Sequence, residues 1–202
     1  MEKKTVTEKA EKIVWKGGTL EAPLPPVMVT CGNGEKANVL TIAWSGIVNS
    51  DPPKTYISVR PSRYSHPIIC ESGEFVINLT TKDLVRAADY CGIYTGAKVN
   101  KFEKMHLETV KAHEVSCPLL AASPVSLECR VCDRIALGSH DMFIADIVAV
   151  DVDSRFIGQD GKLHLEKAGL CAFAHGSYFE LGRKLGNIGF TVRKKGKGSS
   201  GK

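Results

Sequence analysis

The 202-residue chain has no long apolar stretch, and no secretory leader is expected. A membrane-spanning helix needs roughly 18 or more uncharged apolar residues, and no segment approaches that length. The N-terminal sequence MEKKTVTEKAEK is charged and no apolar core follows it, so we expect no signal peptide. The seven cysteines are odd in number and scattered through apolar runs, so they favour a reducing compartment over a disulfide framework. A cytoplasmic protein with no membrane partner is expected.

Motifs of the common nucleotide-binding and hydrolytic enzymes are also missing. No glycine-rich dinucleotide loop follows a predicted strand, and neither a P-loop nor a GxSxG motif occurs. No carboxylate pair is spaced for general acid and base catalysis. Cys129 and Cys132 form a CxxC, but an offset of three within a strand puts the two sulfurs on opposite faces. His106 and His113 fit no metal-ligand spacing either. The sequence therefore predicts no metal site and no catalytic protein residue.

The formal charge of +5 is concentrated at the C-terminus. Residues 191–202 hold five bases and no acid, so subtracting them from the 27 bases leaves 22 bases against 22 acids in residues 1–190. The balanced charge of residues 1–190 gives no indication that the protein binds nucleic acid. We expect residues 1–15 to be a polar lead-in and residues 16–190 to be a single domain. Residues 191–202 are expected to be a disordered basic tail with the composition of a cloning remnant.

What the chain does contain is a series of short β-rich runs separated by turn signals. The predicted strands are Val27–Gly32, Ala37–Ser45, Lys54–Arg60, Glu74–Leu79, Val125–Leu137 and Met142–Val152. One short helix is predicted to begin at Ser65, which is a suitable N-cap residue, and a second to span Thr80–Tyr90. Many strands with few helices predict a mainly β fold, either a closed barrel or a sandwich.

Four segments allow more detailed expectations. Gly32-Asn33-Gly34 is a hairpin-type turn. Residues 92–123 mix glycine, proline and charge, as functional loops do. Met142–Val152 is apolar on both faces and is expected to be buried within a sheet. Val125–Leu137 alternates between apolar and polar residues, as a strand with one buried face does. Its predicted apolar face is Val125, Leu127, Cys129, Val131, Ile135 and Leu137, and its polar face is Ser126, Glu128, Arg130 and Arg134.

The first candidate ligand site lies where a predicted strand ends and a helix begins. Arg60 and Arg63 are suited to forked contacts with a phosphate, and Ser62 and Ser65 add hydroxyl donors. A helix N-terminus offers unpaired N–H groups to the same anion. The segment is interpreted as a mononucleotide phosphate site, with an ordinary solvated turn as the alternative.

The second candidate is the strand Ala37–Ser45. Small residues, among them Thr41, Ala43 and Ser45, flank Trp44 near its end. Small side chains let a flat ring approach the backbone, whose N–H groups can bond to the polar edge of that ring. The alternative is a half-buried strand with Trp44 packed in the core.

Several segments, taken in order, resemble the flavin reductase-like, FMN-binding split-barrel family, and its flavoredoxin members most closely. The matching stretches are Ala37–Gly46, Ser50–Arg60, Ser62–Ile69, Glu74–Asn78, Val99–Glu103, the Leu137–His140 turn leading into Phe143–Val148, and Ala172–Phe179. Together they span roughly residues 20–185. The resemblance implies a six-stranded antiparallel split barrel of the Greek-key type. It also implies non-covalently bound FMN and a homodimer with the flavin near the subunit interface.

The resemblance also implies particular site residues. Asn38 and Trp44 correspond to contacts beside the flavin ring. Ser65 corresponds to a hydroxyl donor to the phosphate, and Lys101 to the basic residue of the mid-chain loop.

Two further positions follow from it. His140 occupies the histidine position in the turn between the two long strands, and Phe173 is the late aromatic residue near the flavin. The sequence departs from the family pattern at Ser139, where relatives often have Asp.

The function implied by the resemblance is an oxidoreductase that passes electrons from NAD(P)H through FMN to an unidentified acceptor. The flavin would do the chemistry. The alternative is a flavoredoxin-type electron-transfer protein that a redox protein partner reduces, without its own nicotinamide site. A third reading is a β-rich binding module that has lost the flavin. The presence of Asn38, Trp44, Ser65 and Lys101 argues against it.

Overall fold

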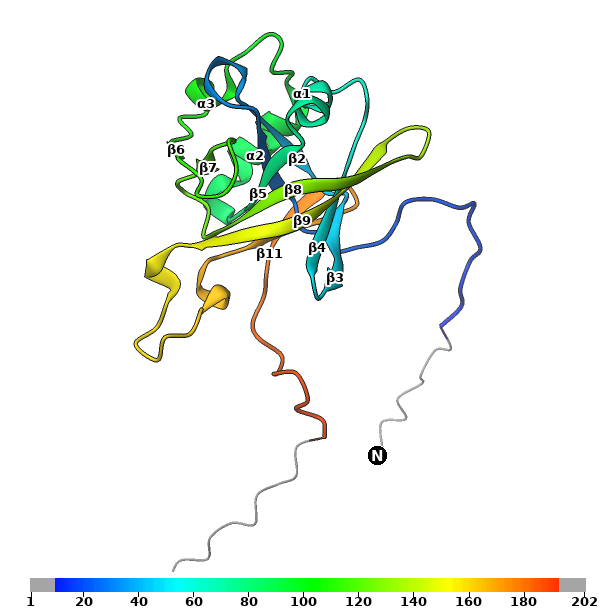
Figure 1. Ribbon diagram of the computed structural model, residues 1–202. Helices are drawn as coiled ribbons and strands as arrows, with labels where there is room; N and C mark the ends of the chain where they lie inside the picture. The colour runs from blue at the N-terminus through cyan, green and yellow to red at the C-terminus, as the bar shows by residue number, and fades with distance from the viewer. Residues whose placement is uncertain (1–9, 193–202) are drawn as a thin grey trace, which may run out of the picture.

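One antiparallel sheet dominates the computed structural model, which describes residues 10–192 (Figure 1). In that part of the chain the sheet has the strand order β2-β1-β5-β8-β9-β4-β3. Its strands are β1 (Val27–Cys31), β2 (Asn38–Ile42), β3 (Ser45–Ser50), β4 (Pro53–Val59), β5 (Glu74–Leu79), β8 (Val125–Ala136) and β9 (Asp141–Val152). Two small pairs join β6 (Thr109–Val110) to β7 (Leu119–Leu120) and β10 (Cys171–Ala174) to β11 (Ser177–Glu180). The predicted mainly β, antiparallel fold is confirmed.

The two edge strands of the sheet meet at one corner. β2 and β3 lie at opposite ends of the strand order, yet only Ala43 and Trp44 separate them along the chain. Ser45 N donates to Ala43 O across 3.1 Å, which makes a tight bend. Ser58 N, on β4, donates to Trp44 O across 2.9 Å. The curled sheet is compatible with a split barrel rather than a sandwich. The prediction of one strand over Ala37–Ser45 was wrong, because the chain crosses here from one sheet edge to the other.

The main core lies inside this curl. Phe75, Ile57 and Phe143 are each at most 1% exposed and pack with Ile69 of helix α1 (Ser65–Ser72). A second cluster forms where helix α2 (Val85–Ile93) packs on β1 and β2. Its buried members are Met28, Val39, Leu84, Ala87, Ala88, Cys91, Leu107 and Leu120. All of β1 is buried, because core lies on both sides of it, and its one buried hydroxyl, on Thr30, donates to Pro118 O.

The long strand β8 does not alternate as predicted. Its pairing with β9 shifts register between Glu128 and Cys129 and again between Val131 and Asp133. Only the second shift inserts an extra residue, Cys132, into β8, and this bulge reverses which face the later residues of β8 occupy, so Ile135 is 37% exposed. Ser126 and Glu128 on the predicted polar face are buried instead. Cys129 is buried and Cys132, the extra residue at the second shift, is exposed.

Strand β9 is less buried than its apolar sequence predicts. Only Phe143 and Ala145 are fully buried, whereas Val150 is 55% exposed. The reason is that β9 pairs with β8 and β4 at its edges, while most of its other side chains are only partly covered by the described residues of this chain.

The short helices and turns also differ from prediction in detail. Ser65 is not the N-cap of α1. Tyr64 takes that position and Ser65 lies in the first turn. The predicted Thr80–Tyr90 helix begins later, with a 3₁₀ turn over Lys82–Leu84 leading into α2. The predicted tight hairpin turn at Gly32–Gly34 is instead a longer connection that contains a 3₁₀ turn at Gly34–Lys36. Residues 92–123 contain helix α3 (Lys101–Lys104) and the small β6–β7 pair.

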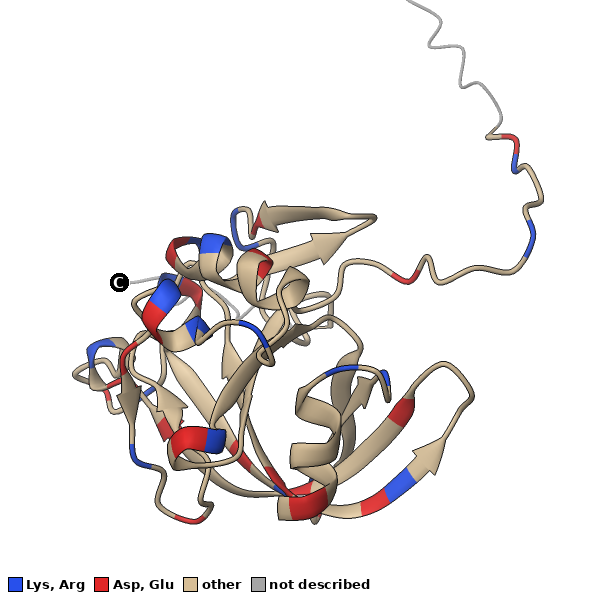
Figure 2. Ribbon diagram, turned by 90° about the horizontal axis from the view of Figure 1, so that it is seen from above, with Lys and Arg blue, Asp and Glu red and all other residues tan. Residues whose placement is uncertain are grey.

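Residues 10–23 and 181–192, at the two ends of the described part of the chain, lead away from the sheet (Figure 1). Residues 10–23 contain no helix or strand, and the predicted basic tail falls largely outside the described residues. Within residues 10–192, no helix is long and apolar enough to cross a bilayer. Figure 2 shows acidic and basic residues interspersed over strands, helices and loops, in keeping with the balanced charge of that region.

Candidate functional site

Two adjoining cavities open beside the corner where β2 turns into β3. Their volumes are about 390 and about 200 Å³, and they share Leu40, Arg60 and Arg63 in their walls. A joint site of this size falls in the range that small ligands and cofactors occupy. The larger is called the polar cavity and is lined by Asn38, Leu40, Arg60, Ser62, Arg63, Tyr64, Ser65, Cys91, Tyr94, Thr95, Gly96 and Lys101. The smaller is called the ring cavity and is lined by Leu40, Thr41, Ile42, Ala43, Trp44, Ser58, Val59, Arg60, Arg63, His140 and Phe173.

Asn38 and Ser65 form one wall of the polar cavity. Both side chains are buried, and Asn38 Nδ2 donates to Ser65 Oγ across 2.6 Å. The hydroxyl oxygen therefore acts as an acceptor toward Asn38, and its own hydrogen remains available to donate into the cavity. Ser65 lies in the first turn of α1, where backbone N–H groups also face an approaching anion.

Lys101 supplies a buried positive charge to the same cavity. It is 3% exposed, and its Nζ donates to Val39 O across 2.7 Å and to Cys91 O across 2.9 Å. An ammonium group has three donors, so one remains for a ligand. Burial, with a smaller contribution from the nearby Arg63, lowers the pKa of Lys101 to about 8. Asn100 holds the residue in place by capping α3, since its Oδ1 accepts from Phe102 N and Glu103 N.

Gly96 shows that this wall is built around a close approach of the backbone. A Cβ at this position would lie 2.7 Å from the Tyr64 ring and would also overlap the side-chain amide of Asn38. Only glycine lets the Thr95–Gly96 loop come this near. The donors that converge here, from Ser65, Lys101 and the two arginines, suit a phosphate group.

The ring cavity is flatter and less polar. Its floor is the end of β2, and Trp44, His140 and Phe173 surround it. Burial lowers the pKa of His140, and so do the charges of Arg60 and Arg63. The imidazole is therefore neutral near pH 7. Ser139, the departure from the family pattern, lies 2.9 Å from His140 Nδ1 through its Oγ and so helps to orient this ring.

A polar end with phosphate donors, joined to a flat end lined by aromatic residues and backbone, fits a flavin mononucleotide. Residues 20–180 match the family described as flavin reductase like domain.

The chain belongs to this flavin reductase-like family.

Individual relatives agree with this assignment. The protein is 30% identical to the flavoredoxin of Desulfovibrio vulgaris (Miyazaki F), with a TM-score of 0.84 over 91% of this chain and 100% of that one. It is 27% identical to the flavoredoxin from Methanosarcina acetivorans, with a TM-score of 0.82 over 91% and 98% of the two chains. An uncharacterised protein of Archaeoglobus fulgidus is 34% identical over 69% of this chain and 77% of its own length. An FMN reductase (NADH) of Stutzerimonas stutzeri is 25% identical over 51% and 57% of the two chains.

The structure gathers most of the site residues predicted for this flavin reductase-like chain. The polar cavity brings together Asn38, Arg60, Ser62, Arg63, Ser65 and Lys101, and the ring cavity Thr41, Ala43, Trp44, His140 and Phe173. Ser45 is buried and lines neither cavity. The Thr41 hydroxyl donates to Ala88 O of α2, so this residue presents its backbone rather than its side chain to the cavity.

Other wall residues were not predicted individually. Tyr94, Thr95 and Gly96 come from the segment after α2, and Ser58 comes from β4. Only the expectation of a functional loop within residues 92–123 pointed toward the first three. No pattern in the sequence distinguishes Ser58 from its neighbours on β4.

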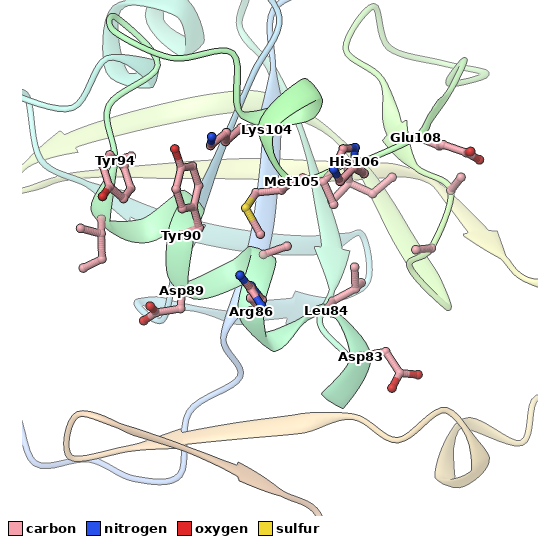
Figure 3. A pocket seen from close by; sticks show the side chains of 16 residues that line it. Asp83, Leu84, Arg86, Asp89, Tyr90, Tyr94, Lys104, Met105, His106 and Glu108 are labelled. Carbon is pink, nitrogen blue, oxygen red and sulfur yellow. The ribbon is translucent and has the colours of Figure 1, made fainter.

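A larger cavity of about 900 Å³ lies along α2 (Figure 3). It shares only Tyr94 with the polar cavity. Tyr90 and Tyr94 stack at one end with ring centres 4.3 Å apart, while Arg86 and Asp89 bring opposite charges to its rim. Because donors of one sign do not converge here, the two smaller cavities are the candidate site for a flavin.

The described residues also hold one cluster of possible metal-ligand atoms, which the sequence did not reveal, at His113, Glu128 and Asp151. Burial alone would raise the pKa of Glu128, but donated hydrogen bonds from three backbone N–H groups and from Asp151 lower it overall. Burial and Glu128 raise the pKa of Asp151. The two neighbouring carboxyl groups therefore have pKa values shifted in opposite directions, and the backbone hydrogen bonds account for the burial of Glu128 without an ion. The absence of a metal therefore stays a prediction.

Proposed function

We propose that the protein binds FMN in the joined cavities and works as an oxidoreductase that takes electrons from NAD(P)H and passes them to an acceptor. The observation that carries this proposal is the change of chemistry along one continuous site. Cationic and hydroxyl donors line the polar cavity, and aromatic residues with exposed backbone line the ring cavity. The FMN reductase (NADH) among the relatives supports the choice of electron donor.

Each part of the site has a defined task in this proposal. Lys101, Arg63 and Ser65 would bind the phosphate and neutralise its charge. The backbone from Leu40 to Trp44 would hold the ring and bond to its polar edge. FMN, when bound, supplies the capacity to accept a hydride and release electrons. No nucleophilic side chain is required of the protein, and the neutral His140 adds no second positive charge beside the ring.

The second candidate is an electron carrier that a redox protein reduces. The likeness to two flavoredoxin structures favours it, since both are covered almost completely by this chain. In this case the same cavities would hold FMN, but no nicotinamide would bind beside it.

We also propose a homodimer located in the cytoplasm. Ile47 and Val48 of β3, Leu137 after β8 and Val150 of β9 are each more than half exposed, which is the surface expected of a sheet that another subunit covers. All seven cysteines are free, as in a reducing compartment.

Anaerobic reduction of the reconstituted protein tests the function. The protein is mixed with FMN, desalted, and titrated with NADH or NADPH without oxygen while its visible spectrum is recorded. We expect flavin absorption that survives desalting and bleaches with one of the nicotinamides. If the flavin bands are retained but neither nicotinamide bleaches them, the result would favour the second candidate, an electron carrier that a redox protein reduces. If flavin is lost on desalting, steady-state reduction of free FMN by the nicotinamides decides whether FMN is a passing substrate or not a ligand.

A further inference from the structure

A thiol, an imidazole, a carboxylate and a guanidinium lie together outside the flavin cavities. Cys70 and His66 are one turn apart on α1, so their side chains share a face of the helix. Cys70 Sγ lies 3.8 Å from His66 Nδ1. The other ring nitrogen, Nε2, lies 2.8 Å from Asp141 Oδ2. Arg134 Nη1 donates to Cys70 Sγ across 3.0 Å.

The imidazole in this group is held in one orientation. His66 and Asp141 are only 12% and 13% exposed at the side chain, and the ring packs edge-on against Phe143 with 5.4 Å between ring centres. A carboxylate at Nε2 keeps the proton on that nitrogen and leaves Nδ1 as an acceptor facing the thiol. His66 can therefore take the proton of Cys70, and Arg134 stabilises the resulting negative charge on sulfur.

The thiol itself is open to reagents. Among the seven free cysteines, only Cys70 and Cys132 are exposed. Cys132 lies 3.5 Å from Lys54 Nζ, so it too has a cation beside it, but no imidazole is in contact with it in the described structure. Both thiols are therefore exposed and have a cation beside them, but only Cys70 also has an imidazole that can act as a base.

We propose that Cys70 is a nucleophilic thiol that undergoes exchange with small anionic disulfides and becomes reversibly thiolated. The Cys70 proton passes to His66 Nδ1, and the thiolate attacks one sulfur of the disulfide. A bond forms between Cys70 Sγ and that sulfur while the original S–S bond breaks, and the departing thiolate takes the proton from His66. Cys70 is oxidised and one half of the small disulfide is reduced to a thiol. Arg134 is 52% exposed, so its remaining donors can bind a carboxylate of the reagent.

The test measures thiolation of the reduced full-length protein by oxidised glutathione, with each site quantified by mass spectrometry of peptides. We expect Cys70 to react faster than Cys132 by on the order of tenfold or more. His66→Asn should abolish most of that advantage, because the amide cannot accept the proton, and should leave the Cys132 rate unchanged. Cys132→Ser is the matched control and should leave the Cys70 rate as it is.

Two features of the experiment guard against a folding artefact. The buried cysteines report unfolding, because they become reactive only if a variant loses its structure. If His66→Asn does so, Arg134→Gln at the half-exposed position replaces it and should also slow Cys70 selectively. Equal rates at Cys70 and Cys132 in the unaltered protein, or an unchanged Cys70 rate in a folded variant, would overturn the proposal. The outcome does not depend on FMN and is therefore separate from the proposed function.

Discussion

Replacing Lys101 by methionine is expected to weaken FMN binding by about 10- to 100-fold, which corresponds to about 1–3 kcal/mol for a lost charge-assisted hydrogen bond. The reason is the buried position of the ammonium group. Two of its donors are occupied by Val39 O and Cys91 O, so the third and the charge are directed to the cavity. Methionine retains the length and apolar stem of lysine. Fluorescence titration of FMN measures the change.

The same residue predicts how FMN affinity depends on pH. With its pKa lowered to about 8, Lys101 is charged below this pH and loses its proton above it. The charged form attracts the phosphate, so affinity should be highest below pH 8 and fall as the pH rises through that value. The decline should be missing in Lys101→Met.

Lys98, an exposed lysine three positions earlier that does not line the cavity, provides the control. Lys98→Met removes the same overall charge and should leave FMN affinity nearly unchanged. Equal affinities in the unaltered protein and in Lys101→Met would remove Lys101 from the site.

The second large effect concerns stability. Glu128→Ala is expected to lower the free energy of unfolding by about 3–5 kcal/mol, as when one partner of a buried polar network is removed. Glu128 is fully buried, and its carboxylate accepts from His113 N at 2.8 Å, Glu114 N at 2.6 Å and Val115 N at 2.9 Å. Alanine would leave these donors unpaired beneath the loop. Urea denaturation measures the loss.

Asp151→Asn is the control for that experiment. Asp151 Oδ2 is buried and has no protein donor near it in the described chain, and burial and Glu128 raise the pKa of Asp151. An asparagine amide can donate to Glu128 in its place and still accept from His113. Asp151→Asn should therefore lower the free energy of unfolding by less than about 1 kcal/mol. A loss as large as that of Glu128→Ala would show that Asp151 is the charged member of the pair.

The strands could be predicted from the sequence because their signals are local. Alternation located β4 and apolar runs located β1 and β5, each to within a residue or two. The failures involve long-range structure. Nothing local shows that the chain turns at Ala43 to cross between sheet edges, or that a bulge at Cys132 reverses the faces of β8. The burial of Glu128 follows from a loop that folds over it, which periodicity cannot reveal.

The residues of the candidate site likewise divide into those with a local sequence signal and those brought together by long-range structure. Arg60, Arg63 and Ser65 could be singled out because phosphate binding demands particular side chains beside a helix start. Lys101 was identified through the family resemblance, since a lone lysine in a mixed loop has no signature of its own. The His66–Cys70 group escaped the sequence analysis because Asp141 and Arg134 reach it from strands far along the chain.

The central claim is that the polar and ring cavities together form one site for a flavin mononucleotide. Comparing the affinities of FMN and riboflavin for the same protein tests it most directly, because the two ligands differ only in the phosphate. We expect FMN to bind at least about 100-fold more tightly, as the loss of several charge-assisted contacts requires. Equal affinities for FMN and riboflavin, or no binding of either, would contradict the account.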